Sequence, residues 1–363
     1  MTFLEQDNSV NKSEVLKALK GIHDPDLQED IVTLDFVKNL TIKDGVVAFT
    51  IQLTTPARPP VKHQIKTEAE NAVRKLDWVR ELFVTMDFKV TSQQDSQPRS
   101  LIPKVSNTIA VASGKGGVGK STVAANLAAA LMNCGAQVGL MDADVYGPSI
   151  PTLMGASQSP QVIGNRIIPP VVYDVKTISM GYFLPKDEAV IWRGPMLHKM
   201  IQQFLGEVEW GSLDYLVIDL PPGTGDIQLS LCQTIPLTGA VIVSTPQDLA
   251  LKVASKAITM FNKLKTPILG VVENMSFYVC SHCGERDDIF SHGGAQKASR
   301  ELGYPFLGEI PLSTEIRLQS DSGNPTALSQ NQYSQAFQSM ASAVAAQVSI
   351  ANRRAVPVPT IEP

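Results

Sequence analysis

The chain has 363 residues, 44% of them hydrophobic and 18% charged, so it can bury more than one core and is not intrinsically disordered. A formal net charge of −4 and a pI of about 5.8 argue against a general nucleic-acid-binding protein. No apolar run reaches the roughly 18 residues of a membrane helix, and the first residues lack the apolar core of a secretory signal. We therefore expect a cytoplasmic protein that binds neither nucleic acid nor membrane.

Residues 1–90 are predicted to form a small α+β domain. Apolar, β-branched segments alternate there with charged helical ones, and residues 43–45 have the composition of a tight turn. The following residues, 91–104, are polar and rich in Ser, Gln and Pro, which is typical of a linker. The expected elements are a helix at 13–20, a strand at 46–53, a helix at 61–76 and a strand within 81–90.

From residue 105 to residue 350, short apolar strands alternate with helical segments. This alternation predicts an α/β fold with a mostly parallel, doubly wound sheet that is covered by helices on both faces. The last residues, 351–363, contain prolines and are expected to form a flexible tail. Strands are expected at 108–113, 137–141, 215–219, 240–244, 268–272 and 306–310, and helices at 122–132, 196–208, 249–264, 295–302 and 332–350.

A glycine-rich segment between an expected strand and an expected helix carries the strongest functional signal. Gly114–Ser121 reads GKGGVGKS, which fits the phosphate-loop pattern of Gly, four residues and Gly-Lys-Ser/Thr. Glycines let backbone N–H groups approach a phosphate chain, Lys120 can reach its β- and γ-phosphates, and Ser121 can hold Mg²⁺. The same letters fit the Gly-x-Gly-x-x-Gly dinucleotide pattern, but a pyrophosphate on a helix N-terminus needs no lysine there. The expected nucleotide-binding residues of this segment are Gly114, Lys115, Gly116, Gly117, Val118, Gly119, Lys120, Ser121 and Thr122.

Carboxylates follow two of the expected strands, at the sheet edge where open α/β folds bind their ligands. Asp142 and Asp144 are separated by one residue, so an extended chain would place both on one side. One could order Mg²⁺ or its waters and the other could orient the attacking water, although a helix or turn cap would use the same residues. Asp219 ends another apolar strand, where a second magnesium-organising carboxylate is expected.

Three further positions have both a functional and a structural interpretation. Lys115 could be an ordinary surface lysine, or it could cross a dimer interface to the partner's nucleotide as an arginine finger does. Gly223, in the Pro- and Gly-rich segment 221–226, could offer its N–H to a γ-phosphate or could form a plain turn. Asn274 carries the donor and the acceptor that suit an adenine edge, although asparagine is common at strand ends.

Short segments occur in this order along the chain: KGGVGKS at 115–121, DADVYGPS at 142–149, DLPPGTGD at 219–226, STPQDLAL at 244–251 and VVENMS at 271–276. Together they resemble the Mrp/ApbC type of iron–sulfur cluster carrier ATPase, which is related to MinD, ParA and the nitrogenase iron protein. The resemblance covers about residues 100–350. The first domain resembles the small metal–sulfur cluster assembly domain often fused ahead of such ATPases, through DPDL at 24–27 and TTPARP at 54–59.

The resemblance implies a homodimer that holds ATP between its two subunits. In such a dimer Lys115 would act in the partner's site, and Asp144 would orient the attacking water as part of the first switch. The remaining implied roles are phosphate and Mg²⁺ binding for Lys120 and Ser121, the end of the Walker B strand for Asp219, the second switch for Gly223 and adenine contact for Asn274.

A cysteine pair, Cys280 and Cys283, separates a metal carrier from a generic ATPase. Two thiolates at this spacing supply half of a tetrahedral set, which a two-fold dimer would complete with four sulfurs. This predicts a shared, solvent-near cluster of the [4Fe–4S] kind, and the resemblance favours iron–sulfur over zinc. Zinc could use the same sulfurs or one pair with His282 or His292, and a redox dithiol or an incidental thiol pair also has this spacing.

One departure from the family pattern concerns the first domain. In that family the TTPA segment is usually followed by a cysteine, and Arg58 stands in that place here. We therefore expect this domain to serve in docking or regulation and not to handle clusters through that position.

These features together predict a slow ATPase that holds a labile cluster between two subunits and passes it to apo-proteins, with cluster scaffold proteins as further partners. A MinD- or ParA-like positioning ATPase is the alternative, but it needs a membrane helix or a DNA-binding surface, and residues 347–363 make a poor membrane anchor. A small-molecule kinase or synthetase on the same fold gives no reason for the cysteine pair.

Overall fold

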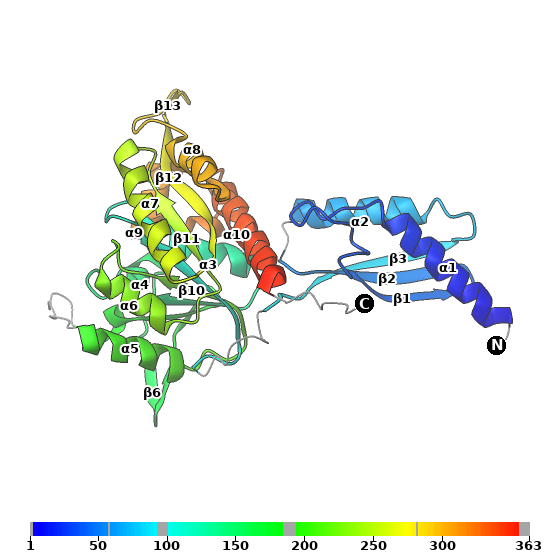
Figure 1. Ribbon diagram of the computed structural model, residues 1–363, viewed down its shortest axis with the longest axis horizontal. Coiled ribbons are helices and arrows are strands. Elements are labelled where there is room, and N and C mark those ends of the chain that lie inside the picture. The colour runs from blue at the N-terminus through cyan, green and yellow to red at the C-terminus, as the bar shows by residue number, and fades with distance from the viewer. Residues whose placement is uncertain (1–2, 57–58, 93–100, 184–193, 281, 356–363) are drawn as a thin grey trace. The chain divides into compact units, whose positions relative to one another are not determined.

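The computed structural model describes residues 3–56, 59–92, 101–183, 194–280 and 282–355. The chain divides into two compact units, residues 1–91 and residues 92–363, and each has its own apolar core (Figure 1). Most of the expected linker, together with Arg58, lies outside the described residues.

The first unit is a three-stranded sheet with two helices, an α+β arrangement. Its central strand, β2, pairs antiparallel with β1 and parallel with β3. Every second residue of β2 is buried, because the residues of one face of the strand point into the core. The elements are α1 (Phe3–Leu19), β1 (Val37–Lys43), β2 (Val46–Leu53), α2 (Pro59–Val73) and β3 (Glu81–Phe88).

The sequence pattern does not predict β1, and the backbone shows why. Its register with β2 shifts between Lys38 and Thr41, and Asn39 lies in the left-handed region with φ of 52°. Such a bulge breaks the two-residue alternation that marks a strand. The turn after β1 uses Asp44 and Gly45, both with positive φ, which is the geometry that suits a two-residue hairpin.

The second unit is built, among the described residues, on a nine-stranded sheet in which most neighbours run parallel. The order is β13-β12-β11-β4-β10-β5-β9-β8, with β14 paired to β12, while β8 and β13 run antiparallel to their neighbours. This confirms the predicted α/β fold class. The strands are β4 (Val105–Ala112), β5 (Val138–Asp142), β8 (Val171–Val172), β9 (Val175–Ser179), β10 (Leu213–Asp219), β11 (Gly239–Ser244), β12 (Ile268–Val279), β13 (Arg286–Asp287) and β14 (Phe306–Leu312), beside a separate hairpin of β6 (Gln161–Ile163) and β7 (Arg166–Ile168).

Helices cover both faces of this sheet (Figure 1). On one face α3 packs against α10, and on the other α7 packs on β11 and α8 on β12. Within β11, Ala240 and Ile242 join the core that contains Phe261 of α7, so the alternate residues point to the opposite face. The helices are α3 (Lys120–Asn133), α4 (Ile150–Leu153), α5 (Gly194–Gly206), α6 (Asp226–Thr234), α7 (Asp248–Lys263), α8 (Gly294–Leu302), α9 (Thr314–Asp321) and α10 (Ser334–Ala355).

The last helix corrects the expected start of the tail. α10 continues to Ala355 instead of ending at residue 350. Asn352 is buried and its Nδ2 donates to Oδ1 of Asn107 at 2.9 Å, so tertiary contact holds this last turn in the helix. No helix within the described ranges is long and apolar enough to cross a membrane.

Candidate functional site

The glycine-rich loop leads from β4 into α3 at the carboxyl edge of the sheet. Gly117 and Gly119 have φ angles of 79° and 77°, in the left-handed region that favours glycine. A Cβ at Gly119 would also collide with the side-chain amide of Asn274. Glycine is therefore required at Gly119 by backbone conformation and by space.

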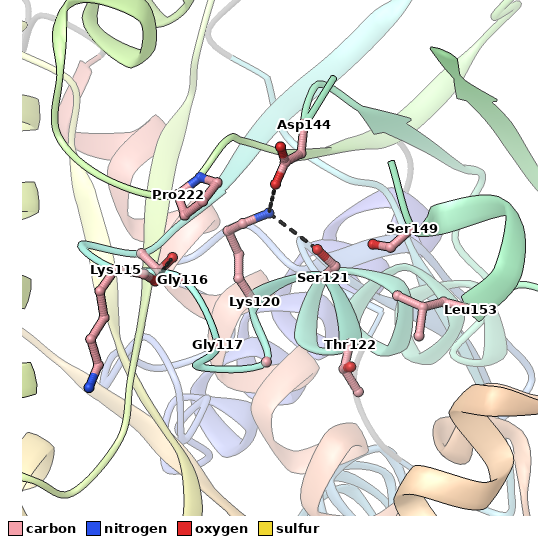
Figure 2. Close-up of a pocket in the computed structure, with 12 residues that line it drawn as sticks. Lys115, Gly116, Gly117, Lys120, Ser121, Thr122, Asp144, Ser149, Leu153 and Pro222 are labelled. Atoms are coloured by element: carbon pink, nitrogen blue, oxygen red, sulfur yellow. Dashed lines mark hydrogen bonds and ion pairs between the residues drawn. The ribbon is translucent and has the colours of Figure 1, made fainter. Parts of the chain in front are cut away.

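A cavity of about 290 Å³ opens over this loop (Figure 2). Its volume is at the lower end of the range for small-molecule sites, so it suits the phosphate end of a nucleotide. Among the predicted nucleotide residues, Lys115, Gly116, Gly117, Gly119, Lys120, Ser121, Thr122 and Asp144 line the cavity, whereas Gly114, Val118, Asp219, Gly223 and Asn274 lie outside its lining.

The Lys120 ammonium is the centre of the charges beside the cavity. It is 6% exposed, forms an ion pair with Oδ1 of Asp219, and lies 3.7 Å from Oδ2 of Asp144 and 3.3 Å from Oγ of Ser121. Within the described part of the chain, the second oxygens of both carboxylates are buried without a hydrogen-bond partner. The spare oxygens of the two carboxylates and the Ser121 hydroxyl are oxygen ligands of the kind that a hard cation such as Mg²⁺ prefers, and the single Lys120 ammonium balances only one of the two carboxylate charges.

Asp142 and Asp144 face different partners, although one residue separates them. Oδ2 of Asp142 accepts hydrogen bonds from the N–H groups of Ser149 at 3.1 Å and Ile150 at 3.2 Å. The same oxygen accepts from the Ser179 hydroxyl at 2.9 Å, and Oδ1 accepts from the N–H of Asp144 at 3.0 Å. Asp142 thus has the turn-capping role that was the alternative interpretation of the sequence, and Asp144 is the carboxylate that lines the cavity.

The buried carboxyl groups carry more negative charge than Lys120 compensates. Burial, and after it the charge of Asp219, raises the pKa of Asp142 to about 7. Burial likewise raises the pKa of Asp219, while the Lys120 ammonium opposes this shift. A bound cation would relieve the repulsion, so the electrostatics of the site also favour a cation.

Lys115 and Gly223 both contact segments beside the loop. Figure 2 shows the Lys115 side chain directed away from the Lys120 ammonium, and its Nζ lies 3.5 Å from Oε1 of Gln247. The N–H of Gly223 donates to the carbonyl of Ser113 at 2.9 Å, and its φ is 104°. The Pro- and Gly-rich segment 221–226 is thus hydrogen-bonded to the start of the phosphate loop.

Asn274 lies against the back of the phosphate loop. Its side chain is 7% exposed, and its Nδ2 donates to the Val118 carbonyl at 2.8 Å. One amide hydrogen of Asn274 is therefore engaged with the loop backbone.

The cysteine pair lies at the turn of a hairpin in which β12 pairs with β13, at the upper end of the second unit in Figure 1. Cys280 donates its N–H to the Glu285 carbonyl and accepts from the N–H of Gly284, both at 2.9 Å. Hydrogen bonds from the backbone N–H groups of Cys283 and His282 lower the pKa of the Cys280 thiol. All four cysteines of the chain are thiols, and Cys283 is exposed, so the pair is open to metal.

A polar cluster below the hairpin was not predicted from the sequence. One ligand-type atom each of Glu273, His292 and Glu309 lie within 4.8 Å of one another. His292 Nε2 lies 2.8 Å from Glu309 Oε2, and the carboxylate of Glu273 accepts N–H groups from Gly293 and Ala295 at the start of α8. His292, a candidate zinc ligand in the sequence, is therefore engaged with Glu309. Glu273 and Glu309 come from two strands and His292 from the loop before α8, so sequence spacing gives no signal for the cluster.

The cavity also has walls that the sequence did not single out. Ser113, Ser149, Leu153 and Pro222 line it. Two of these, Ser149 and Pro222, lie within the DADVYGPS and DLPPGTGD segments. The segments therefore pointed to these two residues, although neither residue type by itself predicts a phosphate contact.

A glycine loop between a strand and a helix, with a buried lysine that pairs with carboxylates at the edge of a parallel sheet, defines a P-loop NTPase. The model of the ParA family described as NUBPL iron-transfer P-loop NTPase matches residues 104–347, and a model described as iron-sulfur cluster assembly protein matches residues 12–84. The chain belongs to this family of iron-transfer P-loop NTPases, with an iron–sulfur cluster assembly domain ahead of the NTPase domain.

Individual relatives agree with this assignment. The iron-sulfur cluster carrier protein of Deinococcus radiodurans is 46% identical over 93% of this chain and 95% of its own length. A solved nucleotide-binding protein of Archaeoglobus fulgidus in complex with ADP is 43% identical, with a TM-score of 0.57 over 62% of this chain and 90% of that chain. The cell division ATPase MinD of Pyrococcus furiosus shares the fold, at 24% identity and a TM-score of 0.51 over 66% of this chain and 98% of that chain. The relation to cluster carriers is much closer than the relation to MinD, which favours the carrier interpretation over the positioning one.

Proposed function

We propose that this chain is an ATP-hydrolysing carrier that holds a [4Fe–4S] cluster between two subunits and transfers it to apo-proteins. One observation carries the proposal: a thiol pair, with Cys283 exposed and the pKa of the half-buried Cys280 lowered, follows the strand whose Asn274 donates to the phosphate loop. A generic NTPase has no need for such a pair at that place. The name of the Deinococcus radiodurans relative supports the same function.

The residues of the cavity divide the nucleotide chemistry among them. Lys120 and the loop N–H groups bind the phosphates, and Ser121 with Asp219 holds Mg²⁺, which supplies charge neutralisation when it is bound. Asp144, which lines the cavity and keeps one oxygen without a hydrogen-bond partner among the described residues, orients the attacking water. Phosphoryl transfer depends on positioning and charge, so these groups can support slow turnover without a covalent step.

The cysteine hairpin supplies two sulfurs, and a cluster needs four. A two-fold homodimer provides the other pair, and the outward direction of Lys115 suits a lysine that serves the partner's nucleotide. The first unit matches the model of an iron–sulfur cluster assembly protein, and we assign it to docking with scaffold and client proteins in the cytoplasm.

Anaerobic reconstitution with iron and sulfide tests the cluster site. Wild type is expected to gain visible absorbance and about four iron and four sulfide per dimer. Cys280→Ser and Cys283→Ser are expected to lose both, while Cys134→Ser, on the half-buried thiol after α3, is the matched control and retains them. Equal iron and sulfide in all four proteins would overturn the site, and stoichiometric zinc without sulfide in anaerobically purified protein would overturn the cluster.

A further inference from the structure

We propose that Asn274 is a positioning residue that passes the state of the phosphate loop to the cysteine pair along β12. The inference rests on the proposed function, because it assigns the link between the nucleotide and the thiols. The phosphate loop and the cysteine pair are separate motifs in the sequence. In the structure, β12 connects the contact with the phosphate loop to the cysteine hairpin.

The first step is the contact between Asn274 and the loop. The 2.8 Å hydrogen bond from Nδ2 to the Val118 carbonyl is buried, so water does not compete for it. Gly119 leaves no room for a Cβ beside the same amide, so the loop and the strand are in close contact at two successive residues. A shift of the loop around a phosphate must therefore displace Asn274 or break a buried hydrogen bond.

The second step is the continuity of the strand. Five residues of β12, 275–279, follow Asn274, and Cys280 comes directly after the strand, about 20 Å from Asn274 in an extended chain. Met275, directly after Asn274, has φ of 55°, and the pairing of β12 with β14 shifts register between Asn274 and Tyr278. The left-handed residue bends the strand at this point, so a small displacement of Asn274 changes the direction of the hairpin that follows.

The third step is the support beneath the hairpin, which we call the hairpin bracket: Ser276, Glu273, Glu309, His292 and Phe277. The Ser276 hydroxyl is buried and lies 2.6 Å from Oε1 of Glu273 and 3.2 Å from Oε2 of Glu309. The bracket links the strand on both sides of Met275 to β14 and to the start of α8, so the segment beyond Met275 is expected to move together with these elements and not to deform internally.

Aromatic contacts extend the bracket to the other strand of the hairpin. The rings of Phe277 and His292 are 6.4 Å apart at 66°, and the Arg286 guanidinium lies 4.0 Å from the centre of the Phe277 ring. Arg286 is the β13 residue opposite Val279 in the pairing. Both strands that flank the thiols are thus held by the same cluster.

Other described contacts of the phosphate loop lead elsewhere. The Ser113 carbonyl accepts from Gly223, which precedes α6, and Lys115 contacts Gln247, which precedes α7. Within the described residues, Asn274 makes the hydrogen bond that joins the loop to β12, the strand that leads into the cysteine hairpin.

Hydrogen–deuterium exchange on the metal-free, full-length chain tests the proposal, with and without saturating Mg²⁺–ADP. In wild type, nucleotide is expected to slow exchange in the loop, residues 113–122, and to change it about fivefold or more at the hairpin amides 276–279 and 284–288. In Asn274→Ala at saturating nucleotide, exchange is expected to slow in the loop and to stay unchanged at the hairpin amides. Gln247→Ala is the matched control, an amide that contacts the loop but lies off β12, and its hairpin responds as in wild type.

A second variant keeps the test decisive if Asn274→Ala cannot bind nucleotide. Ser276→Ala leaves the contact of Asn274 with the loop in place and removes the hydroxyl from the bracket. A protected loop with an unresponsive hairpin supports the proposal. A hairpin that still responds in the nucleotide-binding variant, or that does not respond in wild type, overturns it. Because the experiment uses no cluster, a failed reconstitution would overturn the proposed function and leave this result standing.

Discussion

Asp142 and Asp144 show how burial and partners separate two residues of the same type. Asp142 receives N–H and hydroxyl donors on both oxygens and holds a turn, while Asp144 keeps one oxygen without a partner beside the cavity. The pattern Asp-Ala-Asp places both at a strand end, but the direction of each carboxylate depends on residues that fold against them from elsewhere in the chain.

The raised pKa of Asp142 predicts how stability depends on pH. The folded protein keeps a proton on this group up to pH about 7, whereas the unfolded chain releases it near pH 4. The stabilising contribution is therefore complete below about pH 4 and is lost as pH rises towards 7. Without nucleotide, wild type is expected to lose about 2–3 kcal/mol of unfolding free energy between pH 5 and pH 8 through this group.

Urea unfolding at the two pH values measures this loss, with Asp142→Asn as the comparison because it does not titrate. The variant is less stable at pH 5, since its amide cannot accept every N–H that the carboxyl group accepts, but its pH dependence is smaller. An equal pH dependence in both proteins would contradict the raised pKa.

At the scale of elements, the phosphate loop and β12 are in direct contact through Asn274. Gly119→Ala places a Cβ against Asn274 at a residue whose φ is 77°, so both the loop and its contact must shift. We expect at least a tenfold loss of nucleotide affinity, about 1.4 kcal/mol or more, by isothermal titration. Gly147→Ala is the control, because a Cβ there meets open space and its φ is not positive. Unchanged affinity in Gly119→Ala would mean that the loop adapts freely.

The sequence pattern found β12 only in part, and the difference has a physical cause. The expected strand ends at residue 272, where the apolar run gives way to Glu273 and Asn274, whereas β12 continues to Val279. Pairing with β13 and β14 and burial of polar residues in the bracket extend it. Local apolar patterning cannot report a strand whose polar residues find their partners far along the chain.

For the whole molecule, the proposed dimer predicts complementation between two inactive variants. Lys120→Ala removes the phosphate lysine of its own site, and Lys115→Ala removes the lysine that serves the partner. Each variant alone is expected to lose about 100-fold or more in ATP hydrolysis, in line with the effect of arginine fingers. A mixed dimer regains one complete site, so mixing the purified variants restores measurable phosphate release.

Two comparisons make the mixing experiment specific. Mixing wild type with the doubly substituted Lys115→Ala, Lys120→Ala chain controls for subunit exchange. Neither site of that mixed dimer has both lysines, so activity falls below that of the same amount of undiluted wild-type dimer. If Lys115 acts within its own subunit, a mixture of the two variants stays inactive, because neither chain has both lysines.

The sequence by itself determined the two domains' fold classes, the phosphate loop and the cysteine spacing, because these follow from local periodicity and from residue types at short separations. The tertiary structure decided that Asp142 caps a turn, that Asn274 binds the loop backbone, and that Glu273, Ser276, His292 and Glu309 meet below the thiols. Those contacts join residues from different strands and helices, and only packing of the sheet brings them within hydrogen-bond distance.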